Sequence, residues 1–561
     1  MRNLRLRESS YPWVLFFLFL ATYLLYPTNL PYIDGLYYAY HVENMPLADT
    51  FHPHHLLFLT INQLIFSALH LAIPNLRGLT YFQSFNSFLG ALTLIILYRL
   101  LLGLFKRPLG AFIGTFFYAS TFGFWHHATD ANIYIGFNLL MTIILKRFLL
   151  DENHKKTGNL IITAFLTAFA TLIHQLGIFM ILPIGAYLLA NDKDAKRSFK
   201  PLVMFLGVYF ISVIIPYLLV FIFSVSNGKP SIQLFASWIT AYGSNRIFWP
   251  FLYHDVYYVL SVISRSQFNA IFHVIPMEKI IYRGNVTGEG ASLLNLFNFT
   301  FAIILVLIIE RIHFINFRAN PSEKIIYRKV LAWMTPFFIF FIFFAPENYF
   351  YRILYLAPLV IFTGGLLESS TIRDKRTLKP FLFIFVMFTF LYNTWDGIIP
   401  ESRMMNNPYI VDAISINQEI NPQDLVVFSE QERYLAAVFR YYFNRKCLHA
   451  MSQSRYKKEN EERIEKAKIE TALFMKENFK GIFFSNYTMR MGVETYYFSL
   501  NNFPPPHPEI MVLDKDQIIQ VGQVLTSRGT YFKVRVEEPV RKKIDRDGYI
   551  EEFDEAWEVQ R

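Results

Sequence analysis

The sequence lacks several features that define common classes of protein. It has one cysteine, Cys447, in 561 residues, which excludes an intramolecular disulfide, a cysteine-rich zinc site and a two-cysteine redox motif. Only 17% of its residues are charged, against roughly 25% in ordinary soluble domains. The composition also excludes a disordered chain and a coiled coil, because both need far more polar and charged sequence.

What the sequence does contain is apolar and aromatic residues. Hydrophobic residues make up 53% of the chain, and phenylalanine alone occurs 59 times. A soluble fold would need several cores to bury this apolar surface, so we expect lipid to cover most of it. The formal net charge is +10, which suits either a nucleic-acid partner or positive charge spread over membrane loops.

Runs of apolar residues predict eleven membrane-spanning helices. A helix needs about 20 apolar residues to cross a hydrocarbon core of about 30 Å. The first run follows three arginines and is not followed by a cleavage pattern, so we interpret it as an uncleaved helix rather than a signal peptide. The predicted spans are residues 11–27, 79–102, 109–125, 132–149, 159–174, 176–190, 201–223, 293–309, 330–345, 349–367 and 380–397.

The positions of lysine and arginine test this topology. With the N-terminus in the cytoplasm, the inside loops hold 23 basic residues and the outside loops before residue 398 hold six. Segment 54–73 is apolar but contains three histidines, so we expect it to lie in the membrane interface. Counting it as a crossing would move Lys106 and Arg107 to the outside. The positive charge is therefore a sign of topology, and we expect no nucleic-acid partner.

The chain divides into two predicted domains. Residues 1–397 form a transmembrane domain with large outer loops at 28–78 and 224–292. Residues 398–561 lack a membrane-length apolar run, and short strand-like runs there alternate with helical patterns. The predicted fold class is mainly α. We expect a polytopic membrane protein with about 11 transmembrane helices, an interfacial helix and a small C-terminal extracytoplasmic α/β domain.

Polar side chains gather on the predicted outer side of the membrane. The first outer loop contains Asp34, Asp49 and a histidine-rich turn at 52–55, and the short outer loop 126–131 contains Asp130. The middle of the bilayer is nearly free of charge, which disfavours a transporter with acids or bases along a midplane path. We therefore expect these polar groups to line a single outward cavity.

Five motifs follow one another along the chain. They are Tyr32–Gly35, Phe51–Leu57, Phe124–Tyr134, Leu172–Gln175 and Pro346–Arg352. In their order, spacing and common membrane side they resemble the GT-C class of polytopic glycosyltransferases, and within it the bacterial protein-mannosyltransferase-like branch. The resemblance extends over the first 400 residues or so and carries expectations about activity and site residues.

The chain departs from the family pattern at the second acidic position. The family often has a second acid three residues after the first, where this chain has Tyr37. Another acid is expected just before Ile133, where this chain has Asn132, with Asp130 two residues earlier. These departures leave a metal requirement open, so a divalent metal is neither assigned nor excluded.

The resemblance implies transfer of a sugar from a polyprenyl-phosphate-linked donor to an acceptor hydroxyl on the outer face. The acceptor would be a protein, a glycan or a lipid. Asp34 is the candidate catalytic base and Asp49 the second candidate, since a carboxylate can take the proton of the attacking hydroxyl. A base opposite the leaving phosphate implies inversion at the sugar carbon. The candidate substrate-binding residues are His52, His55, His126, Asp130, Asn132, His174, Arg352 and Lys279.

Structural roles compete with each of these assignments. Asp34 could cap the helix that starts near Gly35, and Arg352 could extend its charge to the membrane surface. The histidines could bind zinc, although no helical His-x-x-x-His spacing supports this. For the whole protein, the alternatives are a lipid or polysaccharide transporter (a flippase) and a non-catalytic envelope scaffold. We expect a multi-pass protein of the inner or plasma membrane, with a cytoplasmic N-terminus and an extracytoplasmic C-terminal domain.

Overall fold

The computed structural model divides the chain into two compact units, Met1–Asn406 and Asn407–Arg561. We describe each unit by itself. The division lies a few residues after the predicted domain boundary at 397. The residues that the structure describes are 8–151, 156–190, 195–225, 230–240, 256–273, 321–344, 348–361, 378–451, 461–491, 493, 495–498, 511–526, 529–537, 542–544 and 550–552.

The first unit consists of helices joined by short turns. Its helices are α1 (Tyr11–Leu25), α2 (Ile33–Asn44), α3 (Phe58–Ala72), α4 (Gly78–Phe105), α5 (Pro108–Ser120), α6 (Phe122–Thr129), α7 (Tyr134–Leu150), α8 (Thr157–Ile173), α9 (Ile181–Ala190), α10 (Ala195–Val220), α11 (Ile232–Ile239), α12 (Val256–Ile271), α15 (Pro321–Phe343), α18 (Leu378–Tyr392) and α19 (Ile399–Glu401). Shorter 3-10 segments are η2 (Leu47–Thr50), η3 (Pro53–His55), η4 (Gln175–Met180) and η8 (Tyr349–Tyr355). A π-helical turn, η9 (Asn393–Ile398), precedes α19.

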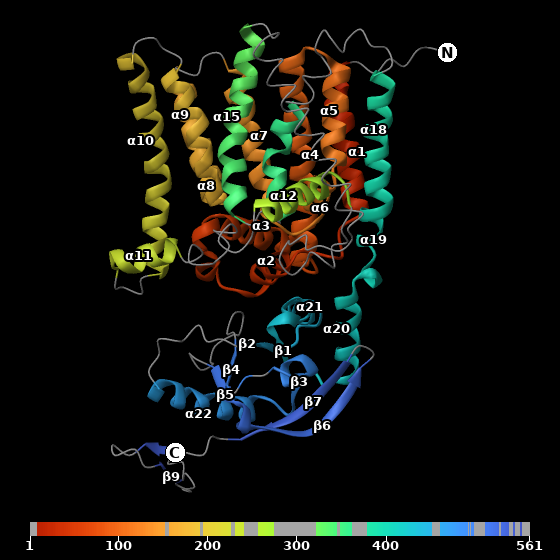
Figure 1. The fold of residues 1–561 in the computed structure, drawn as a ribbon, viewed down its shortest axis with the longest axis vertical. Coiled ribbons are helices and arrows are strands. Elements are labelled where there is room, and N and C mark those ends of the chain that lie inside the picture. Colours follow the sequence, from red (N-terminus) through yellow and green to blue (C-terminus); the bar gives the residue numbers. More distant parts are fainter. Residues whose placement is uncertain are drawn as a thin grey trace. The chain divides into compact units, whose positions relative to one another are not determined.

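Upright helices form a bundle, and the first outer loop forms a separate layer at one end of it. In Figure 1, α4, α5, α7, α9, α10, α15 and α18 run upright, and α2 and α3 lie at the lower end of these helices. Within the described residues, four helices are long and apolar enough to cross a membrane: Gly78–Phe105, Phe199–Val225, Lys324–Phe343 and Phe383–Glu401. The predicted span 293–309 lies outside the described residues. The number of crossings and their direction remain predictions.

Two predicted spans are interrupted, and both interruptions lie at motif positions. The span 109–125 breaks at Thr121, whose hydroxyl donates to the carbonyl of Tyr118, so the helix ends and α6 begins. The span 176–190 begins with the 3-10 segment η4 instead of a regular helix. At its tip Gly177 packs so closely that an added Cβ would lie 2.6 Å from the backbone nitrogen of Thr171.

The second unit is a small α/β domain. Its strands are β1 (Leu425–Ser429), β2 (Cys447–Met451), β3 (Ile482–Ser485), β4 (Thr495–Phe498), β5 (Met511–Asp514), β6 (Ile518–Thr526), β7 (Gly529–Val536), β8 (Lys542–Ile544) and β9 (Ile550–Glu552). Its helices are α20 (Pro408–Glu419), α21 (Arg433–Phe443), α22 (Glu461–Asn478) and α23 (Asn486–Met489). The main sheet has the order β5-β4-β2-β1-β3-β7-β6, with β1 parallel to β2 and β3 and the outer pairs antiparallel.

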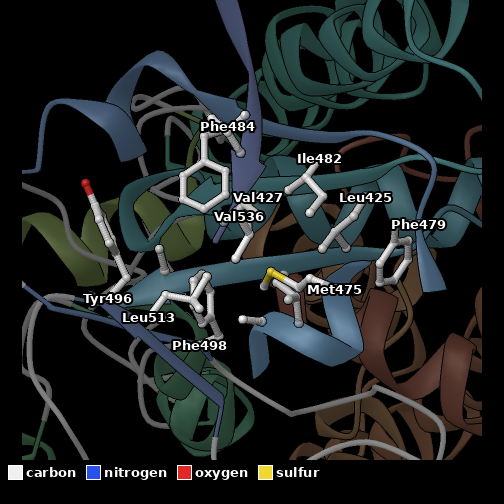
Figure 2. Packing of buried hydrophobic residues seen from close by; sticks show 14 residues of the cluster. Leu425, Val427, Met475, Phe479, Ile482, Phe484, Tyr496, Phe498, Leu513 and Val536 are labelled. Carbon is white, nitrogen blue, oxygen red and sulfur yellow. The ribbon is translucent and has the colours of Figure 1, made fainter. Parts of the chain in front are cut away.

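An apolar core holds this domain together. Side chains from β1, β3 and α22 interdigitate around Val427, Phe484 and Met475, as Figure 2 shows. Strand β1 is buried along its whole length, as expected for a central parallel strand covered on both faces. This core explains why the last third of the chain forms a compact unit without a membrane-length apolar run.

Candidate active site

Asp34 lies in the first turn of α2, where its side chain is half-buried. The N-cap residue of α2 is Tyr32, so Asp34 does not cap this helix as the structural alternative supposed. A carboxylate in the first turn interacts favourably with the helix dipole. The structure therefore places Asp34 at the N-terminal end of α2 and rules out the capping role.

The start of α2 is fastened to the loop that follows α6. Asp130 accepts a hydrogen bond from the backbone nitrogen of Tyr32 at 3.2 Å and a second from Ala131 at 2.7 Å. Gly35 packs against Ala131 so tightly that a Cβ at position 35 would overlap the Ala131 carbonyl oxygen. Two segments nearly 100 residues apart in sequence are thus held together at Asp34.

Asn132 has a structural role in the same loop. Its side-chain oxygen accepts from the backbone nitrogens of Tyr134 and Ile135, at 2.9 and 3.3 Å, in the first turn of α7, whose N-cap residue is Ile133. Its side-chain nitrogen donates to the carbonyl of His127 at 2.6 Å. These bonds use both ends of the amide, so Asn132 shapes the site and is a weaker candidate for direct substrate contact.

The histidine motif forms a compact group of imidazoles. The ring of His55 stacks on that of His52 at 5.5 Å between centroids and meets the ring of His174 edge-on at 4.8 Å. Burial lowers the pKa of His52 to about 4, with smaller contributions from His54 and His41. Burial, and then His174 and His52, also lower the pKa of His55. These loop imidazoles are therefore neutral at neutral pH and can donate or accept hydrogen bonds.

The carbonyl of Pro53 anchors this motif to two neighbouring segments. It accepts from Gln175 Nε2 at 2.8 Å and from the Tyr217 hydroxyl at 2.5 Å. The first contact joins η3 to the tip of the η4 hairpin, and the second joins it to α10. His52 and His174, which are 122 residues apart in sequence, are brought together in this way.

Tyr134 lies between the two groups of predicted residues. Its ring centroid lies 5.7 Å from that of His174 and 5.2 Å from that of His127. It is also within electrostatic range of Asp34. Phe350 completes the connection, because its ring lies 4.5 Å from Tyr32 and 4.9 Å from His127. The predicted residues of the first outer loop and of the α6 loop therefore form one continuous group.

Two imidazoles, that of His127 beside Tyr134 and that of His55 beside His174, are buried with unused hydrogen-bonding atoms. Among the described residues, His55 Nδ1 and both ring nitrogens of His127 have no hydrogen-bond partner. An unsatisfied buried polar atom costs roughly 1–3 kcal/mol, so it is rarely kept without a reason. Polar groups of a bound ligand are one way to satisfy these three atoms.

Arg352 is fully buried in η8. Its Nε donates to the hydroxyl of Ser266 at 2.9 Å and its Nη1 to the hydroxyl of Tyr355 at 3.3 Å. The guanidinium also lies 5.7 Å from the centre of the Phe341 ring. It is two residues from Phe350, which belongs to the group around Tyr134. A buried cation in this position is suited to contact an anion.

The remaining predicted site residues are Asp49 and Lys279. Asp49 lies in η2, and Lys279 lies outside the described residues. Of the outer-loop aromatics, Trp238 packs against Tyr217 and Phe221. The residues that the structure describes contain no group of three or more histidine, cysteine, aspartate or glutamate side chains that could hold a metal ion.

The sequence alone assigns no role to His273, Glu401 and Tyr134, although Tyr134 ends the motif Phe124–Tyr134. His126 Nδ1 lies 3.0 Å from Glu401 Oε2, and His273 Nε2 lies 3.5 Å from Glu401 Oε1. Glu401 is buried although it directly follows the last predicted span, and His273 lies in the longest outer loop. Tyr134 follows the predicted loop 126–131 and could have been found from its position beside Asp130 and Asn132.

Comparison with known proteins agrees with this geometry. Residues 82–220 match the family model described as dolichyl-phosphate-mannose-protein mannosyltransferase. The fold is similar to the crystal structure of ArnT from Cupriavidus metallidurans in the apo state, with a TM-score of 0.52 and 11% identity over 94% of this chain and 98% of that chain. No curated protein matches this chain.

Two further solved structures have lower TM-scores. ArnT from Cupriavidus metallidurans bound to undecaprenyl phosphate has a TM-score of 0.49 and 11% identity over 90% of this chain and 96% of that chain. An oligosaccharyltransferase from Archaeoglobus fulgidus, in complex with zinc and sulfate, has a TM-score of 0.40 and 15% identity over 82% of this chain and 64% of that chain.

The similar fold of ArnT confirms the predicted fold class, a polytopic helical membrane protein. The family match at 82–220 agrees with the predicted enzyme class, a glycosyltransferase, and with the resemblance to the GT-C type. Within that class, the match at 82–220 confirms the resemblance to the protein-mannosyltransferase-like branch. That segment includes the α6 loop with Asp130 and the η4 hairpin with His174, so it overlaps two of the five motifs.

Proposed function

We propose that this protein transfers a sugar from a polyprenyl-phosphate-linked donor to an acceptor hydroxyl on the outer face of the cell membrane, with inversion. The observation that carries the proposal is the single group formed by Asp34, the neutral imidazoles around His55 and Tyr134. It joins a carboxylate to side chains that can bind sugar hydroxyls, at one end of an apolar bundle (Figure 1).

The reaction needs a base on the acceptor side. The acceptor oxygen attacks the anomeric carbon while its proton passes to the Asp34 carboxylate. The bond between that carbon and the phosphate oxygen breaks, and the bonding electrons leave with the polyprenyl phosphate. Attack from the face opposite the phosphate inverts the configuration of the sugar. Asp49 is the alternative base.

The leaving phosphate needs a cation. Negative charge grows on the phosphate oxygen as the bond breaks, and a fixed guanidinium in a buried site stabilises it far better than water does. Arg352 is our candidate, held in place by the hydroxyls of Ser266 and Tyr355. Lys279 is a further candidate for the same role. The relative solved with undecaprenyl phosphate binds a lipid of the class we propose for the donor.

The sugar itself would be held by the imidazoles. His55 and His127 each have at least one buried ring nitrogen without a partner among the described residues, and hydroxyl groups of a sugar would satisfy them. His52 and His174 pack against His55 and fix its ring. His126 and Asp130 support the site from the α6 side.

We place the reaction outside the cytoplasm, with the N-terminus inside and the C-terminal α/β domain outside, on the evidence of the loop charges. The C-terminal domain would help to select the acceptor, which is a protein, a glycan or a lipid. A transporter or an inactive scaffold would have the same fold without sugar transfer, so an activity measurement separates these alternatives.

Substitution of Asp34 tests the proposal. Membranes containing the protein are incubated with a panel of radiolabelled polyprenyl-phosphate sugars, and transfer to endogenous acceptors is measured. We expect the wild type to transfer one of these sugars and Asp34→Asn to lose at least about 100-fold of the rate, since removal of a general base costs 10²–10⁴. Asp151→Asn removes a carboxylate elsewhere in the same unit and should keep the wild-type rate.

Two outcomes would count against the proposal. Turnover by Asp34→Asn at the wild-type rate would refute the base assignment. No transfer by the wild type from any donor, together with movement of labelled lipid between leaflets, would favour the transporter instead.

A further inference from the structure

Five titratable side chains form a line through the first unit. From one end they are Asp130, His126, Glu401, His273 and Asp396. Successive nitrogen–oxygen distances are 3.8, 3.0, 3.5 and 3.1 Å. Acids and imidazoles alternate along it. The first four side chains are buried, whereas the last has a side chain that is 54% exposed.

The centre of this line is Glu401. One carboxylate oxygen faces His126 and the other faces His273, so a single side chain orients two imidazoles. Its backbone carbonyl accepts a hydrogen bond from the backbone nitrogen of Asn29 at 2.8 Å. The Asn29 side chain donates to the next carbonyl, that of Ser402, at 2.5 Å. The chain leading into α2 is therefore held at Glu401 as well as at Asp130.

The far end of the line supports the start of α2. Asp130 accepts from the backbone nitrogen of Tyr32, the N-cap residue, and Asp34 follows two positions later. An ionised carboxylate forms a stronger hydrogen bond with an N–H donor than a protonated one does. The charge of Asp130 thus affects how firmly Asp34 is held.

The neighbours of Asp130 set that charge. Burial raises the pKa of Asp130 to about 7, while His126 and the two backbone N–H groups oppose the rise. Burial alone would lower the pKa of His126, but the hydrogen bond and charge of Glu401, followed by Asp130, outweigh it and raise that pKa. An imidazolium at His126 therefore depends mainly on Glu401.

Other groups lie near Asp130, but they do not replace the effect of His126 on its pKa. His127, on the same helix, is held neutral by burial, which lowers its pKa, and then by His126. Tyr349 approaches from η8 and Tyr32 from the first outer loop, and both are phenols. The amide of Asn86 on α4 donates to the Asp130 carbonyl and carries no charge. Among the described neighbours, His126 is the side chain whose charge lowers the pKa of Asp130.

We propose that Glu401 is a positioning residue for the transfer reaction: it holds an imidazolium at His126, which keeps Asp130 ionised, and ionised Asp130 fixes the start of α2 and so the Asp34 carboxylate. The inference rests on the proposed function, because it assumes that Asp34 acts as the base. His273 completes the line and stabilises the charge of Glu401, and Asp396 at the exposed end favours the protonated form of His273.

The experiment compares the wild type with Glu401→Gln. Glutamine keeps the size and one acceptor oxygen but removes the charge. Without that charge His126 loses its proton at a lower pH, and Asp130 then keeps its proton to a higher pH. Removal of the Glu401 charge also acts directly on Asp130 in the opposite sense, but this effect is the smaller of the two.

We expect the acid limb of the kcat/KM profile of Glu401→Gln to move to higher pH by about one unit, so that activity on the acid side falls about tenfold. Asp151→Asn, whose carboxylate pairs with Arg147 elsewhere, is the matched control and should keep the wild-type profile. If Glu401→Gln has the wild-type pH profile of kcat/KM and only a lower thermal stability, Glu401 has a structural role alone. That result would overturn the inference.

A second measurement does not depend on activity. Hydrogen exchange at residues 30–37 is followed by mass spectrometry at a fixed pH of 7 in both proteins, with residues 160–170 of α8 as the internal reference. We expect faster exchange at 30–37 in Glu401→Gln and equal exchange in α8. If the wild type transfers no sugar, the proposed function fails, and unchanged exchange at 30–37 separately refutes the positioning role.

Discussion

At the residue scale, the site combines side chains whose charge states are set by burial. The imidazoles of His52 and His55 are neutral because burial penalises their charged forms. His126 is buried as well, yet the hydrogen bond and charge of Glu401 raise its pKa. The same residue type therefore has two proposed roles: neutral histidines that bind sugar hydroxyls, and a histidine beside Asp130 whose protonated form is favoured.

The proposed role of Arg352 at the leaving phosphate can be tested by substitution. Arg352→Gln keeps a long polar side chain but removes the charge that we assign to the leaving phosphate. We expect kcat/KM measured with the lipid donor to fall by 10²–10³, the usual cost of losing one group that stabilises transition-state charge. Dependence on acceptor concentration should change much less.

Ser266→Ala is the control for this prediction, because it removes a hydroxyl that accepts from Arg352 while leaving the guanidinium in place. Its effect on donor use should be several-fold at most. If Arg352→Gln shows wild-type dependence on the donor, the residue does not contact the phosphate.

At the element scale, short irregular segments position the candidate site residues, and the long helices hold these segments in place. The break at Thr121, the turn before α2 and the 3-10 segment η4 each place a motif residue where a continuous helix would not. These turns can approach each other closely because glycine, which has no side chain, lies at the points of contact. Gly35 against Ala131 is the contact nearest to Asp34.

Gly35→Ala tests this packing. The new methyl group would overlap the backbone carbonyl of Ala131, which cannot move as a flexible side chain could, so α2 must shift. We expect transfer activity to fall at least tenfold and thermal stability to decrease by about 1–3 kcal/mol, the range for overpacked sites. The measurements are transfer rate and thermal unfolding in detergent.

Gly158→Ala is a matched control, because Gly158 lies within α8 and an added Cβ meets nothing within 4 Å. Alanine there should be neutral or slightly stabilising, since it favours the helix. Equal behaviour of the two variants would mean that the contact between Gly35 and Ala131 does not hold the site.

At the scale of the whole molecule, an apolar helical unit carries the site, and a separate α/β domain follows it. The distribution of basic residues predicts which side of the membrane each loop occupies. The first unit contains both the motif loops and the buried line of acids and imidazoles, so it holds every described residue of the candidate site.

Thiol labelling tests the predicted orientation. In a Cys447→Ser background, Thr157→Cys should be shielded from an impermeant thiol reagent added to intact cells, because loop 150–158 is predicted to face the cytoplasm. Asn75→Cys, in the first outer loop, should react. Both positions are exposed in the structure, so access depends on the membrane side alone. Labelling of Thr157→Cys at the rate of Asn75→Cys would reverse the topology.

The sequence by itself determined the fold class and predicted several candidate site residues. Apolar runs are local signals, so the helices and the second domain could be predicted from them. Asp34, His52, Asp130 and His174 could be found because each lies in a short recognisable motif on one predicted side of the membrane.

Only the tertiary structure decided which residues work together. Glu401 and His126 are 275 positions apart, and no local pattern marks a glutamate after the last span as buried between two imidazoles. The structure also shows that the Asn132 side chain accepts from the first backbone N–H groups of α7, and its predicted substrate contact stays a prediction. Burial and partner distance set the charge and role of a side chain, and both arise only when distant segments pack together.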